Sequence, residues 1–301
     1  MPNVNVAGDA PKDYIRIYEY GSGRRANKHS WPAHIAKVGH KYYPNESITE
    51  HLLTRIGQKI GMNMAESQLM WFGRQIRFLS RYFLSHEREQ LIHGAEIFGG
   101  YLQDRNFVEE VEAANQALNI FTFQFVEDAI LDRFVEHAED LLSEFVRLIA
   151  FDAIVGNNDR HYYNWGVITD LGRRNPPRFS PIYDTARALF WNTTDITLEK
   201  MANNRMRRGT WMRKYVERCF PKIGWDGYES PNHFELIRKI ALQRACYRSM
   251  MAGLCPLNLA EIVADLIDAE FRGLITDVRA DFIAECLDHR AKMFHEALAQ
   301  S

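Results

Sequence analysis

Residues 156–166 read Gly-Asn-Asn-Asp-Arg-His-Tyr-Tyr-Asn-Trp-Gly, a polar stretch between a helical pattern and two strand patterns. Apolar residues recur at three- and four-residue steps before it, over residues 125–149, which indicates one long or two consecutive amphipathic helices. Two short strand patterns follow at residues 165–169 and 178–182, around a turn that contains glycine and proline. A hairpin there would return Asp184 to the polar stretch. Alone, Gly-Asn-Asn-Asp is also ordinary chemistry for a helix end or a turn.

The acidic and amide side chains of this region suit phosphoryl transfer. Asp159 is followed five positions later by Asn164, and Asp184 comes after the predicted hairpin. One carboxylate can orient the hydroxyl that attacks a phosphate, while an amide oxygen and a second carboxylate hold Mg²⁺. The same offset separates the catalytic Asp from the metal-binding Asn in the catalytic loop of kinases. The three residues together favour a catalytic site over a plain turn.

The amino-terminal part alternates strand and loop patterns. One strand is expected over residues 13–20 and another over residues 33–38, with the glycine-led, basic loop 21–30 between them. A strand, a glycine-containing loop and a strand that carries a lysine is the order in which a kinase amino-terminal lobe grips the phosphates of ATP. The loop has only two glycines, so a flexible hairpin connection is the alternative.

A helix is expected next, beginning at a capping box of Ser47 and Glu50 and ending at Gly61. Glu50 could instead face Lys37 and hold this lysine on the phosphates of ATP. The sequence leaves the cap and the ion pair as alternatives. Lys37 also has a plain alternative, because a lysine at a strand end is usually solvated.

A hairpin over residues 68–72 and 75–84 is expected to close a small antiparallel sheet. Its exit, at Tyr82 and Phe83, is where a hinge between two lobes would lie and where adenine would pair with the backbone. From residue 87 onward we expect mainly helices.

Length and composition fit a globular protein of two lobes. The 301 residues can bury a sizeable core, and 46% hydrophobic and 25% charged residues are close to average soluble usage. We therefore expect an α+β, two-lobed, protein-kinase-like fold, with a sheet-containing N-lobe over residues 1–86 and a larger helical C-lobe over residues 87–301. No apolar run approaches about 20 residues and the first residues lack a signal pattern, so we expect a cytoplasmic protein without membrane contact.

Charge and cysteine content argue against several function classes. A net charge of −2 gives no overall attraction to nucleic acid or anionic membrane, and we expect no direct nucleic-acid binding. The four cysteines have neither CxxC spacing nor a matched histidine pair, so they indicate neither a zinc site nor a disulfide framework. A basic cluster over residues 205–218 is most often a solvated helix face, and docking of an acidic protein or nucleic acid is the alternative.

Two motifs together resemble a known family. Residues 157–164, Asn-Asn-Asp-Arg-His-Tyr-Tyr-Asn, and residues 181–184, Pro-Ile-Tyr-Asp, resemble the carboxy-terminal signature of HipA-like serine/threonine kinases, the toxin components of bacterial toxin–antitoxin systems. Residues 35–37, Ile-Ala-Lys, and the glutamate of the predicted helix are similar to the ATP lysine and helix glutamate of that family. The resemblance extends in order over residues 13–190.

The resemblance implies an enzyme that uses ATP and Mg²⁺ to phosphorylate serine or threonine of a protein, which in this family can be an aminoacyl-tRNA synthetase or another translation factor. It implies that Asp159 is the catalytic aspartate and that Asn164 and Asp184 bind Mg²⁺. His161 would touch the γ-phosphate, with a packed histidine as the alternative. The nucleotide-binding residues would be Lys37, Glu50, Gly21, Ser22, Gly23, Tyr82 and Phe83.

The resemblance also implies regulation and partners. Autophosphorylation of a loop serine, Ser22 or else Ser30, would eject the loop from the nucleotide site, since the new phosphate is repelled by ATP and pairs with loop cations. The implied partners are the protein substrate and a separate antitoxin protein. The family's usual amino-terminal subdomain and a fused helix-turn-helix antitoxin are not expected in this chain, which puts antitoxin docking and toxin activity in question.

Two other interpretations stay open. The first is a lipid or small-molecule kinase, because Asp-Arg-His-x-x-Asn also occurs in lipid kinases, although those place Asp-Phe-Gly where this chain has Tyr183-Asp184-Thr185. The second is a nucleotide-binding pseudokinase or interaction module that uses the basic cluster. Retention of the lysine, both aspartates and the asparagine argues against it, because a scaffold does not need all four.

Overall fold

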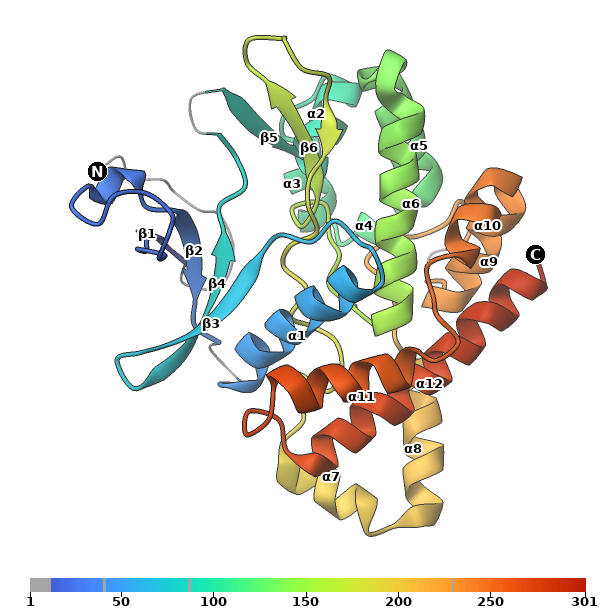
Figure 1. Ribbon diagram of the computed structural model, residues 1–301. Coiled ribbons are helices and arrows are strands. Elements are labelled where there is room, and N and C mark those ends of the chain that lie inside the picture. Colours follow the sequence, from blue (N-terminus) through green and yellow to red (C-terminus); the bar gives the residue numbers. More distant parts are fainter. Residues whose placement is uncertain (1–11, 40–41, 86–87, 229) are drawn as a thin grey trace.

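A four-stranded antiparallel sheet forms the amino-terminal part of the computed structural model, which describes residues 12–39, 42–85, 88–228 and 230–301 (Figure 1). The strand order is β1-β2-β4-β3. The expected strand over residues 13–20 ends early, at Arg16, because the amide of Ile17 donates to the carbonyl of Pro32 and proline has no N–H to continue the ladder. The strands are β1 (Lys12–Arg16), β2 (Ala33–Lys37), β3 (Ser67–Phe72) and β4 (Gln75–Arg81).

Helix α1 (Asn45–Lys59) packs against β3 and β4. The predicted capping box is wrong: the helix begins before Ser47, whose hydroxyl accepts a hydrogen bond from the amide of Gly39 at 3.2 Å. Glu50 is therefore not needed at the helix end and is buried, with 4% of its surface exposed. The helix ends at Lys59, with Ile60 as its C-cap, before Gly61 in a left-handed conformation (φ +77°), and its sequence predicts this stop at Gly61.

A second, three-stranded antiparallel sheet joins distant parts of the chain in the order β5-β6-β7. Strands β6 (Gly166–Asp170) and β7 (Arg178–Phe179) form the predicted hairpin. Strand β5 (Glu89–His93) corrects the expectation of helices from residue 87, and it pairs with β6 more than 70 residues later. The expected lobe boundary, between residues 86 and 87, lies outside the described residues.

The rest of the chain is helical, with α6 (Ala138–Val155) at its centre (Figure 1). The predicted helical region over residues 125–149 consists of two helices, α5 and α6, with a 3-10 turn (Val135–His137) between them. The other helices are α2 (Gly94–Leu102), α3 (Phe107–Ala113), α4 (Ala117–Ile120), α5 (Phe123–Arg133), α7 (Asp195–Ala202), α8 (Arg205–Glu217), α9 (His233–Gln243), α10 (Ala245–Ala252), α11 (Leu259–Glu270) and α12 (Asp277–Ala299).

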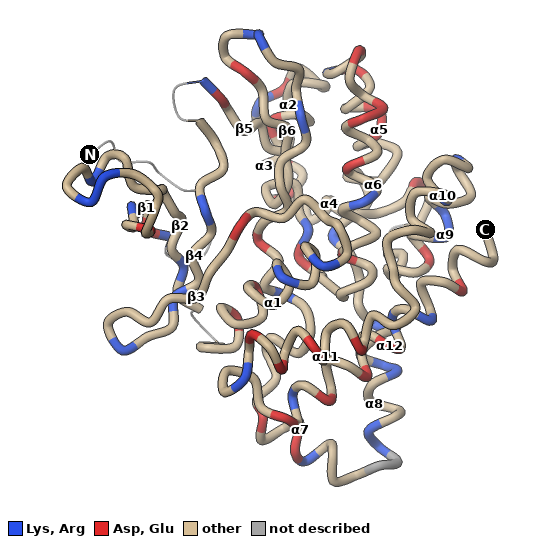
Figure 2. The backbone as a smooth tube through the Cα atoms, in the orientation of Figure 1, with Lys and Arg blue, Asp and Glu red and all other residues tan. Residues whose placement is uncertain are grey.

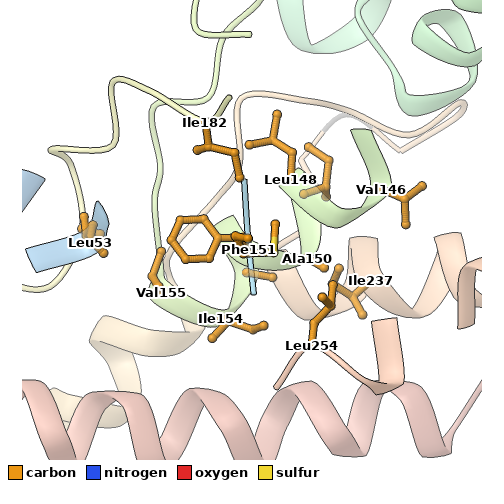
Figure 3. Close-up of a cluster of buried hydrophobic side chains, with 14 of the residues drawn as sticks. Leu53, Val146, Leu148, Ala150, Phe151, Ile154, Val155, Ile182, Ile237 and Leu254 are labelled. Carbon is orange, nitrogen blue, oxygen red and sulfur yellow. The ribbon is translucent and has the colours of Figure 1, made fainter. Parts of the chain in front are cut away.

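The hydrophobic core surrounds the last turns of α6, where every residue from 148 to 155 is buried. Figure 3 shows Phe151 and Ile154 of α6 among side chains from α1, α9 and the segment after β7. Helices α5, α9, α10 and α12 pack against α6. The polar stretch that follows α6 therefore starts from a rigid support.

The basic cluster over residues 205–218 lies mostly on α8, at the outer edge of the molecule (Figure 2). Arg208 pairs with Glu285 at 2.6 Å and its guanidinium lies 4.3 Å from the ring centre of Phe282, whereas Arg213 and Lys214 are exposed. Both interpretations of this cluster remain predictions. Among the helices described, none combines the length and the apolar character that a membrane crossing requires.

Candidate active site

A cleft of about 1400 Å³ separates the amino-terminal sheet and α1 from the polar stretch after α6. The amino-terminal part contributes Lys37 at the end of β2 and Glu50 of α1. Tyr82 and Phe83, just after β4, also line the cleft. The sequence-predicted residues that line it from the opposite side are Asp159, His161, Asn164 and Asp184.

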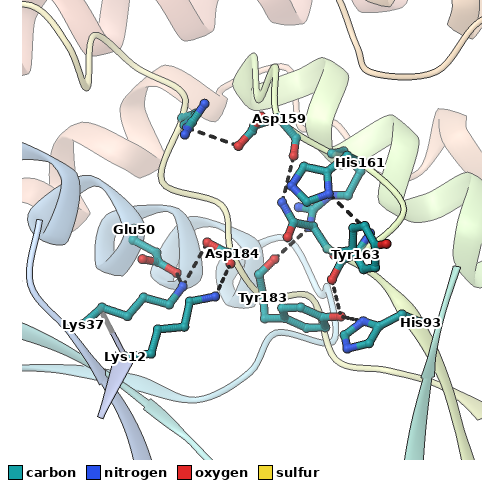
Figure 4. Close-up of polar contacts among 12 residues, drawn as sticks. Lys12, Lys37, Glu50, His93, Asp159, His161, Tyr163, Tyr183 and Asp184 are labelled. Atoms are coloured by element: carbon teal, nitrogen blue, oxygen red, sulfur yellow. Dashed lines mark hydrogen bonds and ion pairs between the residues drawn. The ribbon is translucent and has the colours of Figure 1, made fainter. Parts of the chain in front are cut away.

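Lys37 connects the two sides of the cleft through ion pairs (Figure 4). Its Nζ lies 2.8 Å from Oε1 of Glu50 and 2.9 Å from Oδ1 of Asp184. Burial alone would lower the pKa of Lys37, but the carboxylates of Asp184 and Glu50 outweigh it and raise that pKa. Lys37 therefore stays charged. Of the two alternatives for Glu50, the structure contains the ion pair with Lys37 and not the helix cap.

Asp184 has two cationic neighbours. Its Oδ2 lies 3.2 Å from Nζ of Lys12, on β1, in addition to the contact with Lys37. Burial would raise the pKa of Asp184, whereas Lys37 and Lys12 lower it below its usual value, so the side chain is a carboxylate. For Glu50, burial is the larger effect and raises the pKa despite the nearby Lys37. Sequence reasoning missed Lys12, because strand patterns do not show which cation will meet a distant aspartate.

A buried ion pair anchors the polar stretch. Nε of Arg160 lies 2.8 Å from Oδ2 of Asp152 on α6, and both side chains are almost fully buried. Arg160 also donates to the carbonyls of Asn164 at 2.6 Å and Tyr183 at 2.7 Å. One guanidinium thus ties the helix end, the polar stretch and the residue before Asp184 together. Sequence reasoning missed this pair, although an aspartate within the apolar run Leu148–Val155 was the signal for it.

Asp159 is positioned by the side chains of Asn157 and Arg187. Its amide donates to Oδ1 of Asn157 at 3.3 Å, and its Oδ2 lies 3.1 Å from Nε of Arg187. Burial raises the pKa of Asp159 above its usual value, more than Arg187 and His161 lower it. The carboxylate is therefore a stronger base than an ordinary exposed aspartate.

Asn164 faces the same region. Its Nδ2 donates to the carbonyl of Asp159 at 2.9 Å, which fixes the amide with its nitrogen toward the loop backbone. Its Oδ1 and the carboxylate of Asp184 are hard oxygen donors of the kind Mg²⁺ binds. Among the described residues, no group of three or more His, Cys, Asp or Glu side chains could hold a metal ion. Mg²⁺ in phosphoryl-transfer sites is bound by one or two protein oxygens plus substrate phosphates, and this pair fits that need.

His161 and the hinge residues complete the walls of the cleft. Burial lowers the pKa of His161, so its ring is neutral near neutral pH, and its Nδ1 accepts a hydrogen bond from the amide of Tyr163 at 3.3 Å. The ring centre of Phe83 lies 5.8 Å from that of Tyr183. The Tyr183 hydroxyl in turn lies 3.1 Å from Nδ1 of His93 at the end of β5, a contact that sequence reasoning did not foresee (Figure 4).

The structure does not bring Gly21, Ser22 and Gly23 to this cleft. Ser22 and Gly23 line a separate hollow of about 430 Å³, which shares Tyr82 with the cleft. The loop is closed on itself, because the amide of Ser22 donates to the carbonyl of Glu19 at 3.0 Å and that of Arg24 to the hydroxyl of Ser30 at 2.9 Å. Ser22 and Gly23 thus border the neighbouring hollow and not the cleft.

Comparisons with known proteins give the family of the chain and proteins that it resembles. The model of the family described as HipA-like C-terminal domain matches residues 4–245. The serine/threonine-protein kinase CtkA of Helicobacter pylori is 23% identical over 162 residues, which cover 54% of this chain and 46% of that protein. A relative from Haemophilus influenzae is 25% identical over 224 residues, covering 70% of this chain and 62% of the relative. The chain thus spans less than two thirds of the length of either curated relative.

Two solved structures share the fold. The crystal structure of the H. pylori proinflammatory kinase CtkA matches with a TM-score of 0.70 and 15% identity, over 89% of this chain and 91% of that chain. A Shewanella oneidensis toxin–antitoxin complex of HipA, HipB and operator DNA matches with a TM-score of 0.57 and 15% identity, over 99% of this chain and 67% of that chain. The predicted α+β fold class, with a small antiparallel sheet and a larger helical part, is confirmed.

Proposed function

Because the chain belongs to the family with a HipA-like C-terminal domain, as its sequence motifs predicted, we propose that it is an ATP- and Mg²⁺-dependent serine/threonine protein kinase. One observation carries the proposal: a single cleft gathers Lys37 on one side and, on the other, Asp159, Asn164 and Asp184, the last of which pairs with Lys37 across the cleft. Phosphoryl transfer requires mainly such positioning and charge, because the protein has little covalent chemistry to perform.

Each residue has a distinct part in the proposed reaction. Lys37, oriented by Glu50, binds nucleotide phosphates, and Tyr82 with Phe83 borders the adenine. Asn164 and Asp184 hold Mg²⁺, which supplies positive charge for the phosphate oxygens when it is bound. The hydroxyl oxygen of the substrate attacks the γ-phosphorus, the bond from that phosphorus to the ADP oxygen breaks, and Asp159 accepts the hydroxyl proton.

The raised pKa of Asp159 supports its role as the base, since a stronger base is a better acceptor for the hydroxyl proton. A neutral His161 on the cleft wall can donate a hydrogen bond to a phosphate oxygen. We keep the division into an N-lobe over residues 1–86 and a C-lobe over residues 87–301 as part of the proposal, with the nucleotide between the lobes.

Regulation by autophosphorylation is a further part of the proposal. Ser22 lies in a loop beside the cleft that also carries the exposed cations Arg24, Arg25 and Lys28. A phosphate on Ser22 could pair with these cations, and Ser30 is the second candidate site. A phosphosite map of the active protein that shows no phosphate in residues 21–30 would contradict this part.

The substrate and partner are proposed from the family alone. The substrate would be a protein of the translation machinery, such as an aminoacyl-tRNA synthetase, and a separate antitoxin would bind this chain. Mass spectrometry of a lysate treated with the purified protein and ATP would identify phosphorylated serine and threonine residues. Co-purification from the native host would identify a bound antitoxin.

The acceptor class is tested by incubating the protein with γ-labelled ATP and Mg²⁺ beside a lysate and beside phosphoinositide-containing vesicles. The proposal predicts label on serine or threonine of protein. Label on lipid alone would replace it with a lipid kinase. ATP binding without transfer to either acceptor would replace it with a pseudokinase.

A further inference from the structure

Lys12 is the second cation at the candidate metal-binding aspartate. Lys12 on β1 stands directly opposite Lys37 on β2 in the antiparallel register. Opposite residues of paired strands project from the same face of a sheet, so the two side chains leave the sheet in parallel. Figure 4 shows both reaching toward Asp184, and both line the cleft.

Two lysines in this arrangement need a reason. Like charges directly opposite each other on paired strands destabilise the pairing. Here Asp184 accepts Lys37 on Oδ1 and Lys12 on Oδ2, and Glu50 provides the second carboxylate. The two ammonium groups and the two carboxylates balance, which makes the group tolerable in a largely buried place.

The same contacts conflict with metal binding. Both oxygens of Asp184 are engaged by ammonium groups, whereas a metal ligand must offer at least one of them. Lys37 retains a partner in Glu50 when Asp184 turns to a metal. Lys12 loses its contact with Oδ2 if that oxygen turns to a metal, and the nucleotide phosphates that arrive with Mg²⁺ offer new acceptors in the same cleft.

We propose that Lys12 is a second phosphate-binding lysine, which holds Asp184 in the free protein and transfers to the nucleotide phosphates when the nucleotide binds. This inference rests on the proposed kinase function and adds a residue to it. Lys12 is thus a nucleotide-binding residue of β1, in addition to a counter-ion of Asp184. Its long, flexible side chain and compact charge suit an exchange between two anionic acceptors.

ATP binding by isothermal titration calorimetry, with and without Mg²⁺, tests the proposal without measuring turnover. Lys12→Met is expected to weaken ATP binding by roughly tenfold or more, the worth of one charge-assisted hydrogen bond. Lys12→Arg keeps the charge and is expected to retain most of the wild-type affinity for ATP. Lys200→Met, at an exposed lysine of α7, is the matched control and binds as the wild type does.

A double-mutant cycle separates phosphate binding from a purely structural pairing with Asp184. In the Asp184→Asn background, the carboxylate that lies 3.2 Å from Lys12 is already neutral, and circular dichroism checks that the single and double variants are folded. The proposal predicts that Lys12→Met still weakens metal-free ATP binding there.

Two results would overturn the assignment: Lys12→Met with wild-type affinity, or an effect that vanishes in the Asp184→Asn background. A wild-type protein that binds no ATP at all would instead refute the proposed function, and the assignment with it.

Discussion

The buried pair of Asp152 and Arg160 gives the sharpest prediction on stability. Relative exposures of the two side chains are 2% and 1%, so Asp152→Ala leaves an uncompensated guanidinium in the interior. Breaking a buried pair in this way costs about 3–5 kcal/mol. In proteins of about this size, each kcal/mol of lost stability lowers the melting temperature by about 2–4 °C. The melting temperature of Asp152→Ala should therefore fall by roughly 10 °C.

The assay is thermal unfolding followed by circular dichroism, with Asp288→Ala as the matched control. Asp288 forms an exposed ion pair with Lys292, and such pairs contribute about 0–1 kcal/mol. Asp152→Ala should also lower ATP-dependent activity well below its own melting temperature, because Arg160 holds the carbonyls of Asn164 and Tyr183. A melting temperature for Asp152→Ala within the range of the control would refute the anchoring role of this pair.

Three further predictions concern single side chains. Glu50→Gln removes the charge that orients Lys37, and steady-state kinetics should show the KM for ATP rising roughly tenfold. Because burial raises the pKa of Asp159, kcat/KM should fall as the pH drops through that raised pKa. In a pH–rate profile of Asp159→Asn, this fall on the acidic side should be absent. Burial lowers the pKa of His51 from 6.5 to about 4, so the folded protein excludes a proton that the unfolded chain accepts. The free energy of unfolding in urea should therefore drop by about 2 kcal/mol between pH 7 and pH 5, and by less in His51→Gln.

Much of the fold could be predicted from local sequence patterns. The end of α6 before Gly156, the β6–β7 hairpin and the β3–β4 hairpin each depend on residues close together in sequence, and all three were predictable. Strand β5 was missed because its partner lies far along the chain, so no local signal distinguishes it from a helix start. The false cap at Ser47 matched a local motif, but the helix begins at Asn45, and Glu50 lies inside it and pairs with Lys37 at 2.8 Å.

The candidate site also contains residues that local sequence patterns predicted and residues that only the tertiary structure brings to it. Asp159, Asn164 and Asp184 followed from spacing, because one loop and one hairpin hold all three. Lys12 could not be predicted as a site residue. Its contact with Asp184 depends on the register of β1 with β2 and on the packing of the amino-terminal sheet against the segment after β7. The glycine-led loop was expected over the nucleotide, but in the structure the loop is closed on itself by its own hydrogen bonds, and Ser22 and Gly23 border a neighbouring hollow.

The central claim, that this cleft transfers phosphate, is tested most directly by single-turnover transfer from γ-labelled ATP with Mg²⁺. Wild type, Asp159→Asn, Asp184→Asn and the control Lys200→Met are compared at saturating ATP. We predict transfer by the wild type and the control, and a loss of roughly 10²- to 10⁴-fold in Asp159→Asn despite retained ATP binding. Asp184→Asn should lose Mg²⁺-dependent transfer. Transfer by Asp159→Asn at the wild-type rate would contradict the claim.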